Sequence, residues 1–291
     1  MKNIVEIKNL TKSYPNFKLD SINMELPYGE IIGLIGENGA GKTTLISLLL
    51  NQLHLESGEI RIFDMKYNKN EMKIKQNIGF VVDECCFHSC LNPKEINNIM
   101  KYIYSKWCSE TFFKLLKDLK ISEVIEVNEM SKGMKKKLML AVALSHNPKL
   151  LILDEVTSGL DPVIRDDILT ILQRSVLNKK TTVIFSTHIT SDLDKIADKV
   201  AFLHKGKLVF YEPMDILKKK YKIVECSKNN YNIIKKENIV TSYLQNGKYH
   251  VLINNKENIS NYKGLVDVKT PNLDDIMLAY IKGDRNYDRA T

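Results

Sequence analysis

The stretch that most constrains this chain is the glycine-rich segment Gly36–Thr43, which reads Gly-Glu-Asn-Gly-Ala-Gly-Lys-Thr. It fits the pattern of a phosphate-binding P-loop, which follows a strand and opens a helix. Residues 30–35 are short, apolar and β-branched, as in a buried strand, and residues 44–50 are apolar and lack a helix breaker. A strand before the segment and a helix after it disfavour the alternative, a glycine-rich turn in which the lysine has no role in binding phosphate. The segment therefore predicts a nucleotide-binding α/β domain.

The residue types in the loop suit phosphate chemistry. Glycines without a Cβ let the backbone turn its N–H groups toward phosphate oxygens, and the helix N-terminus behind them adds partial positive charge. Lys42 is expected to reach the β- and γ-phosphates, and the Thr43 hydroxyl to bind Mg²⁺. The predicted nucleotide-binding residues of this loop are Gly36, Glu37, Asn38, Gly39, Ala40, Gly41, Lys42, Thr43 and Thr44.

Composition excludes some classes of protein. The net charge is +8, but the lysines are scattered without interleaved aromatics, so no nucleic acid partner is expected. The five cysteines are odd in number and lack metal-ligand spacing, which favours a reduced cytosolic protein. We find no signal peptide and no apolar run long enough to span a bilayer. Any membrane role is therefore expected to come through a partner.

The order of predicted elements indicates a core, a helical insertion and an appendage. The core has strands at 4–10, 19–26, 60–63, 78–82, 150–153, 181–185, 198–203 and 207–210. Apolar residues at helical spacing predict a helical subdomain over about residues 84–146. Beyond this core, short strand-like pieces and a helix starting near Asn272 predict a small α+β appendage. The predicted domains are residues 1–218 and 219–291.

Polar residues follow three of the buried strands, at the edge where parallel sheets place their chemistry. Asp154 is expected to hold Mg²⁺ beside Thr43, and Glu155 to accept a proton from an attacking water. His188 ends the next strand and is the candidate contact to the γ-phosphate. The predicted catalytic residues are Lys42, Glu155 and His188. An apolar run followed by two acids is weak evidence alone, but beside a P-loop it becomes specific.

Residues 4–211 resemble the ATP-binding cassette (ABC) ATPases. By that resemblance residues 36–43 are the Walker A motif, residues 150–154 the Walker B motif, and Glu155 the catalytic carboxylate. The family signature corresponds to residues 130–134, in which Ser131 and Gly133 would contact phosphate. Residues 158–161 correspond to the D-loop, His188 to the switch histidine and Tyr14 to the aromatic that stacks on adenine. The ordered set of motifs distinguishes this family from kinases, GTPases and helicases.

The sequence departs from the family pattern in the signature and the Q-loop. Lys132 and Met134 replace the usual Gly and Gln, and Asp83, with Glu84 beside it, replaces the Q-loop glutamine. Asp83 is therefore a third candidate metal ligand with Thr43 and Asp154, although a solvated linker residue is the alternative. This form of the motifs is similar to the bacterial drug, bacitracin-type and lantibiotic-type exporters.

The resemblance implies an ATP- and Mg²⁺-dependent ATPase that energises a separate membrane permease, most simply an exporter. It implies a homodimer, or a heterodimer with a second cassette, at the inner face of the membrane. The alternatives are a soluble ABC protein acting on ribosomes or DNA, and a regulatory subunit with little turnover. A single cassette without sustained heptads disfavours the first alternative, and the intact catalytic residues disfavour the second.

Overall fold

The computed structural model describes residues 3–177, 181–254 and 267–287 of the chain. It separates into two compact units, Met1–Tyr211 and Glu212–Thr291. The division precedes the predicted boundary at residue 218 because helix α8 (Met214–Lys220) belongs to the second unit. Lys220 pairs with Glu212, and α8 contacts the following strand β10 (Tyr221–Cys226). The predicted appendage also includes residues 255–266 and 288–291, which lie outside the described residues.

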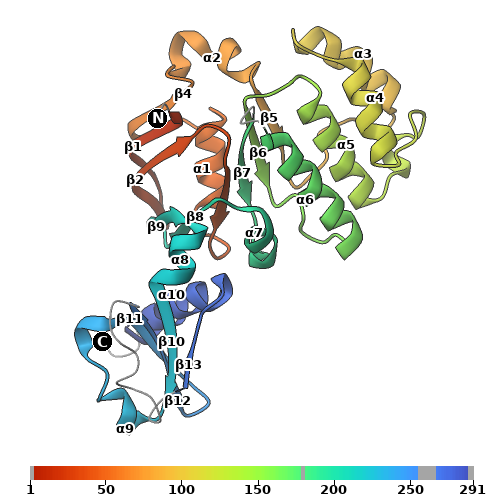
Figure 1. Ribbon diagram of the computed structural model, residues 1–291. Helices are drawn as coiled ribbons and strands as arrows, with labels where there is room; N and C mark the ends of the chain where they lie inside the picture. The colour runs from red at the N-terminus through yellow and green to blue at the C-terminus, as the bar shows by residue number, and fades with distance from the viewer. Residues whose placement is uncertain (1–2, 178–180, 255–266, 288–291) are drawn as a thin grey trace. The chain divides into compact units, whose positions relative to one another are not determined.

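A six-stranded sheet in the order β5-β6-β7-β3-β8-β9 organises the first unit (Figure 1). Its strands are β3 (Ile31–Ile35), β5 (Ile78–Val81), β6 (Leu150–Asp154), β7 (Thr182–Ser186), β8 (Lys199–His204) and β9 (Lys207–Pro213). The five neighbouring strands β5, β6, β7, β3 and β8 pair in parallel. Of these, β3, β6 and β7 are buried along their whole length. Continuous burial is expected of parallel strands covered on both faces. The parallel arrangement brings the polar ends of β3, β6 and β7 to one edge.

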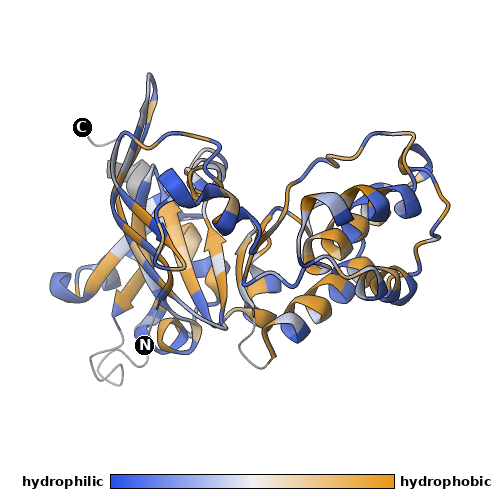
Figure 2. Ribbon diagram, turned by 90° about the horizontal axis from the view of Figure 1, so that it is seen from above, coloured by the Kyte–Doolittle hydropathy of each residue, from blue (hydrophilic) through white to orange (hydrophobic). Residues whose placement is uncertain are grey.

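A second, antiparallel sheet in the order β2-β1-β4 packs in the same core. Its strands are β1 (Asn3–Tyr14), β2 (Phe17–Pro27) and β4 (Ser57–Ile62). Helix α1 (Lys42–Leu49) contributes Leu45, Ile46, Leu48 and Leu49 to the hydrophobic cluster that joins this sheet to β3. Figure 2 shows hydrophobic residues along both the strands and the helices of this unit. The P-loop is therefore held at both ends by buried elements.

The remaining helices of the first unit include the predicted helical subdomain. They are α2 (Tyr67–Lys75), α3 (Pro93–Ile103), α4 (Ser109–Asp118), α5 (Lys132–Leu144), α6 (Pro162–Val176) and α7 (Thr190–Ile196), with a 3-10 turn at Val127–Glu129. Asn92 forms a capping box with Glu95, and Pro93 follows it as the first residue of α3, so this helix has a well-defined start. Helices α3, α4 and α5 share a hydrophobic cluster separate from that of the sheets. None of the described helices is long and apolar enough to cross a membrane.

The second unit is a small α+β domain of its own. Its antiparallel sheet has the order β11-β12-β10-β13, with β11 (Ile239–Gln245), β12 (Lys248–Asn254) and β13 (Asp267–Lys269). Helix α10 (Leu273–Tyr287) packs on β11 and β12, and the short α9 (Lys228–Tyr231) contacts β12. A further 3-10 turn covers Lys236–Asn238. The pairing of β11 was not predicted because its Asn- and Lys-rich surroundings read as turns.

His146 is a buried titratable group outside the catalytic edge. Its side chain is fully inaccessible, stacks on Tyr104 with ring centroids 3.9 Å apart, and donates from Nε2 to the carbonyl of Ile78 at 3.1 Å. Nδ1 is buried without a hydrogen-bond partner among the described residues. Burial lowers the pKa of His146 from 6.5 to about 4. The neutral ring is therefore part of the contact between α3, α5 and the sheet.

This burial predicts acid sensitivity. Because the folded pKa is below the unfolded one, the stabilisation is complete above about pH 6.5 and is lost as pH falls toward about 4. Between about pH 7.5 and pH 5 the loss should reach roughly 2 kcal/mol. We expect His146→Gln to unfold at a temperature that varies less over this range than the wild type does. His54→Gln, at an exposed site, is the control; equal pH dependence in both variants would contradict the assignment.

Candidate active site

The P-loop joins the end of β3 to the start of α1, and its glycines adopt backbone conformations that other residues rarely take. Gly36, Gly39 and Gly41 have φ values of 157°, 82° and 105°. A Cβ on Gly36 would lie 2.3 Å from the carbonyl oxygen of Leu203, and one on Gly41 would lie 2.8 Å from the ring of Phe17. Strain and lack of space thus both require glycine at these two positions. The loop has the conformation that the sequence pattern predicts.

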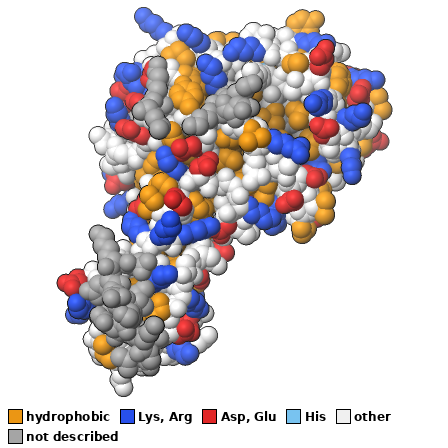
Figure 3. Space-filling view, viewed as in Figure 1, with side chains coloured by type: hydrophobic (Ala, Val, Ile, Leu, Met, Phe, Trp, Pro, Cys, Tyr) orange, Lys and Arg blue, Asp and Glu red, His pale blue; other side chains and the backbone are white. Residues whose placement is uncertain are grey.

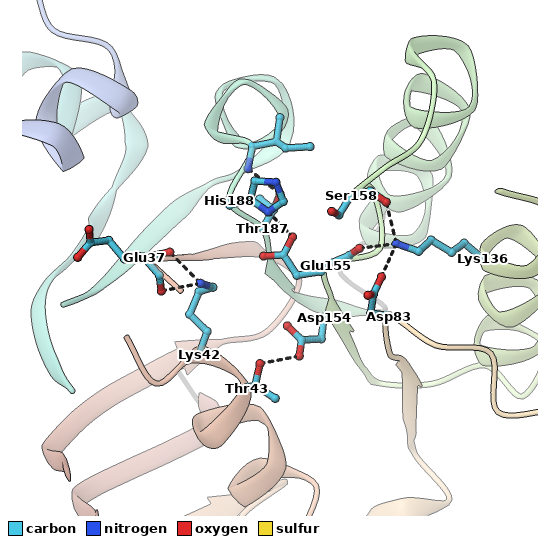
Figure 4. A network of polar contacts seen from close by, with 12 residues as sticks. Glu37, Lys42, Thr43, Asp83, Lys136, Asp154, Glu155, Ser158, Thr187 and His188 are labelled. Carbon is cyan, nitrogen blue, oxygen red and sulfur yellow. Dashed lines mark hydrogen bonds and ion pairs between the residues drawn. The ribbon is translucent and has the colours of Figure 1, made fainter. Parts of the chain in front are cut away.

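Lys42 is the first residue of α1 and its ammonium group is turned onto the loop. Nζ donates to the carbonyl oxygens of Gly36 and Glu37 at 2.7 and 3.1 Å (Figure 4). Burial lowers the pKa of Lys42, while the nearby carboxylates of Glu155 and Asp154 act in the opposite direction. An ammonium that is buried and donates to neutral carbonyls favours an incoming anion. Lys42 therefore lies where a bound phosphate would replace weaker partners.

Thr43 and Asp154 meet across the gap between α1 and β6. The Thr43 hydroxyl donates to Asp154 Oδ2 at 3.1 Å, and the other carboxylate oxygen, Oδ1, is buried without a hydrogen-bond partner among the described residues. Buried carboxylate oxygens are ordinarily paired, because an unpaired one is costly. The pair therefore offers two neighbouring oxygen atoms to a ligand.

Glu155 and His188 form the third contact of the site. His188 Nδ1 lies 2.6 Å from Glu155 Oε2, so the ring N–H donates to the carboxylate. The Glu155 amide donates to the Ser186 carbonyl at the end of β7, and Glu155 has a left-handed φ of 52°. The carboxylate is oriented by a ring from the neighbouring strand end. This is the arrangement that a general base needs.

An open cavity of about 500 Å³ extends from these groups. It is lined by Asn16, Phe17, Asn38, Gly39, Gly41, Lys42, Thr43, Thr44 and Glu155. Tyr14, the predicted adenine-stacking residue, does not line it; its ring is 40% exposed and its centroid lies 6.4 Å from that of Phe17. Phe17 was missed because the second strand was predicted to begin at residue 19, whereas β2 begins at Phe17. Ala40 is buried behind the loop, and the side chain of Glu37 lies 3.6 Å from His204.

The signature residues belong to α5. Ser131 is the N-cap of this helix and accepts from the Met134 amide at 3.2 Å. A Cβ on Gly133 would lie 2.8 Å from Ile164, so glycine permits close packing of α5 on α6. Among the described residues no hydrogen bond joins the predicted signature residues Ser131 and Gly133 to the P-loop of the same chain.

Asp83 lies just beyond β5 and its carboxylate contacts lysines. Oδ1 is 2.9 Å from Lys136 Nζ and 3.5 Å from Lys132 Nζ. The hydrogen bond from Lys136 is the main reason that the pKa of Asp83 is lowered. Among the described residues no hydrogen bond or ion pair joins Asp83 to Thr43 or Asp154, and its role as a metal ligand stays a prediction. Lys136 was missed because it stands in the run of lysines at residues 135–137, and consecutive lysines are typical of a solvated surface.

Comparison with known proteins identifies the family. The profile of the ABC transporter family matches residues 19–158. The bacitracin transport ATP-binding protein BcrA of Bacillus licheniformis is 35% identical, covering 80% of this chain and 78% of its own. The chain belongs to the ABC transporter ATP-binding family. The ABC transporter ATP-binding protein YtrB of Bacillus subtilis is 28% identical, covering 98% of this chain and 100% of its own. The lantibiotic transport ATP-binding protein SrtF of Streptococcus pyogenes is 30% identical, covering 73% of this chain and 92% of its own.

Solved structures agree on the ABC fold. An ATP-binding subunit of an ABC transporter has a TM-score of 0.69 at 23% identity, covering 74% of this chain and 92% of its own. A dimeric cassette in a post-hydrolysis state with ADP and phosphate has a TM-score of 0.66 at 22% identity, covering 72% and 98%. The predicted fold class and family are thus confirmed, and the chain is an ATP-binding ATPase of the ABC type.

Proposed function

We propose that this chain binds ATP with Mg²⁺ and hydrolyses it to drive a separate exporter permease. The observation that supports this most is the meeting of the Thr43–Asp154 and Glu155–His188 contacts beside the P-loop cavity. The similarity to bacitracin and lantibiotic transport ATP-binding proteins supports an exporter of that class. The second unit has no proposed role in hydrolysis.

The residues around the P-loop cavity are proposed to have separate roles in ATP hydrolysis. The P-loop backbone and Lys42 bind and orient the phosphates, and Glu155 takes the proton of the attacking water while His188 holds its carboxylate. Thr43 and Asp154 fit Mg²⁺, because hard oxygen ligands suit that ion and Asp154 Oδ1 has no other partner among the described residues. When bound, Mg²⁺ would neutralise part of the phosphate charge.

Two cassettes are proposed to act together. The signature residues Ser131 and Gly133 open α5, whose N-terminus suits phosphate, yet they lie apart from the P-loop of their own chain. A second copy, or a related cassette, would bring its signature to the cavity. On the face of the first unit shown in Figure 3, basic side chains are interspersed with acidic and hydrophobic ones.

The permease is proposed to dock beside the Asp83 segment. A mostly apolar cavity of about 270 Å³ there is lined by Leu50, Gln52, Met72, Lys75, Gln76, Ile78, Phe80, Ile103 and Tyr104. Met72 and Ile103 are 71% and 49% exposed, and the neighbouring Tyr102 is 93% exposed. Exposed apolar groups around a pocket mark an interaction site. A short apolar helix of the permease would fit, placing this chain at the inner face of the membrane.

Purification from detergent-solubilised membranes of the host tests this function. We expect the tagged chain to carry a polytopic membrane protein with it, and Ile103→Glu to reduce that recovery about tenfold or more, because a charge in the apolar cavity is poorly solvated. Val124→Glu, at a 63% exposed position outside the cavity, is the matched control. Recovery of ribosomal or DNA-bound partners instead, unaffected by Ile103→Glu, would contradict a transport role.

A further inference from the structure

Lys136 is a fully buried lysine in α5, within the three-lysine run that follows the signature. Its side chain is 1% exposed, whereas that of Lys132, one helical turn earlier, is 57% exposed. Charged side chains are seldom buried unless they are paired, because an ammonium loses its hydration in the interior. The interior position therefore requires specific partners for the Lys136 ammonium.

Three oxygens surround this ammonium. Nζ donates to the carbonyl of Glu155 at 2.7 Å, to the carbonyl of Ser158 at 3.0 Å, and to the Asp83 carboxylate at 2.9 Å (Figure 4). A lysine ammonium has three N–H donors, so its hydrogen-bonding capacity is filled. The acceptors come from the catalytic residue, from the turn that follows it, and from the segment after β5. One side chain thus joins three separate parts of the unit.

The contact to Glu155 matters because of the backbone conformation there. Glu155 has a left-handed φ of 52°, which a residue with a Cβ adopts only when its surroundings stabilise it. Its amide donates to the Ser186 carbonyl and its carboxylate accepts from His188, while its carbonyl accepts from Lys136 Nζ and, at 3.2 Å, from the Ser158 amide. Without Lys136 the Glu155 backbone would keep the Ser158 contact but would lose the shortest hydrogen bond to its carbonyl.

We propose that Lys136 is a positioning residue for Glu155, and that Asp83 acts on hydrolysis through Lys136 and not as a metal ligand. Asp83 supplies the opposite charge that keeps the Lys136 ammonium in place. A movement of the segment that carries Asp83 would therefore move Lys136 and, through its hydrogen bonds, the turn that contains Glu155 and Ser158. The inference rests on the proposed role of Glu155 in hydrolysis. Since Asp83 follows the strand that contributes Phe80 to the apolar cavity, a partner bound there would act on the same link.

Lys136→Met tests the link, because methionine keeps an unbranched apolar stem and removes the ammonium. We expect kcat for ATP hydrolysis to fall roughly tenfold to a hundredfold, as displaced catalytic groups do. ATP affinity should stay within about twofold of wild type, because the P-loop is untouched. Lys137→Met is the matched control: it is the next residue, 11% exposed, and pairs with Asp167 at 2.9 Å. Equal kcat in the two variants, or equal losses of kcat and ATP affinity in Lys136→Met, would overturn the proposal.

Asp83→Asn gives a second test, and its 52% exposed side chain makes misfolding a small concern. We expect a several-fold lower kcat, with the Mg²⁺ concentration for half-maximal hydrolysis unchanged. The kcat of the double variant Asp83→Asn/Lys136→Met should be no lower than that of Lys136→Met alone, because both substitutions break the same Asp83–Lys136 contact. A shifted Mg²⁺ midpoint, wild-type kcat in Asp83→Asn, or fully additive losses would each refute the proposal. Glu155→Gln distinguishes a failure of the proposed function from a failure of the Lys136 proposal. If this variant retains wild-type turnover, the proposed function fails, whatever the Lys136 variants show.

Discussion

Glu155→Gln is expected to lower ATP turnover about a hundredfold or more while ATP binding is retained, because glutamine cannot accept the proton of the attacking water. The substitution preserves size and leaves Lys42, Thr43 and the loop glycines in place. Steady-state phosphate release measures turnover, and calorimetric titration with Mg-ATP measures binding. Glu84→Gln, at an exposed acid beside Asp83, should retain wild-type turnover. Near-wild-type hydrolysis by the Glu155 variant would remove this residue from the role of general base.

The same variant should reveal the assembly. If ATP is held between the P-loop of one copy and the signature of another, as proposed, it should keep the two copies together when hydrolysis is blocked. We therefore expect light scattering to show Glu155→Gln as a dimer with Mg-ATP and as a monomer without nucleotide. A monomer under both conditions would leave only a heterodimer with another cassette as the partner arrangement.

Lys42→Ala is expected to weaken ATP binding roughly 10- to 100-fold, as the loss of charge-assisted hydrogen bonds does. The effect should be large because the site also contains the Asp154 and Glu155 carboxylates, which raise the pKa of Lys42 against the effect of burial. Without the ammonium, these two acids would face the phosphates uncompensated. The loss should be greatest for ATP and least for adenosine, which carries no phosphate.

The control for this measurement is Lys69→Ala, which removes an exposed lysine of α2 and changes the net charge equally. Its ATP affinity should equal that of wild type at moderate salt. An unchanged affinity in Lys42→Ala would show that the P-loop assignment is mistaken. An equal loss in both variants would instead point to a general charge effect.

Several elements could be predicted because their information is local. The P-loop conformation follows from glycines at positions where φ is positive, and the start of α3 follows from the Asn92 cap with Pro93 after it. The acids after β6 were recognised because a short apolar run ending in Asp154 and Glu155 is contiguous in the sequence. Helix α7 was not predicted, since it is a short helix that carries the buried polar residues Thr190 and Asp192.

The amino-acid sequence by itself determined the ABC fold, the Walker motifs and the candidate roles of Lys42, Asp154, Glu155 and His188, because each depends on residue types at fixed short spacings. The tertiary structure decided which side chains meet. It placed Phe17 in the cavity where Tyr14 was expected, and Lys136 against the Asp83 carboxylate. Periodicity could not reveal these contacts: whether a lysine is solvated or buried depends on oxygens that distant segments bring to it on folding.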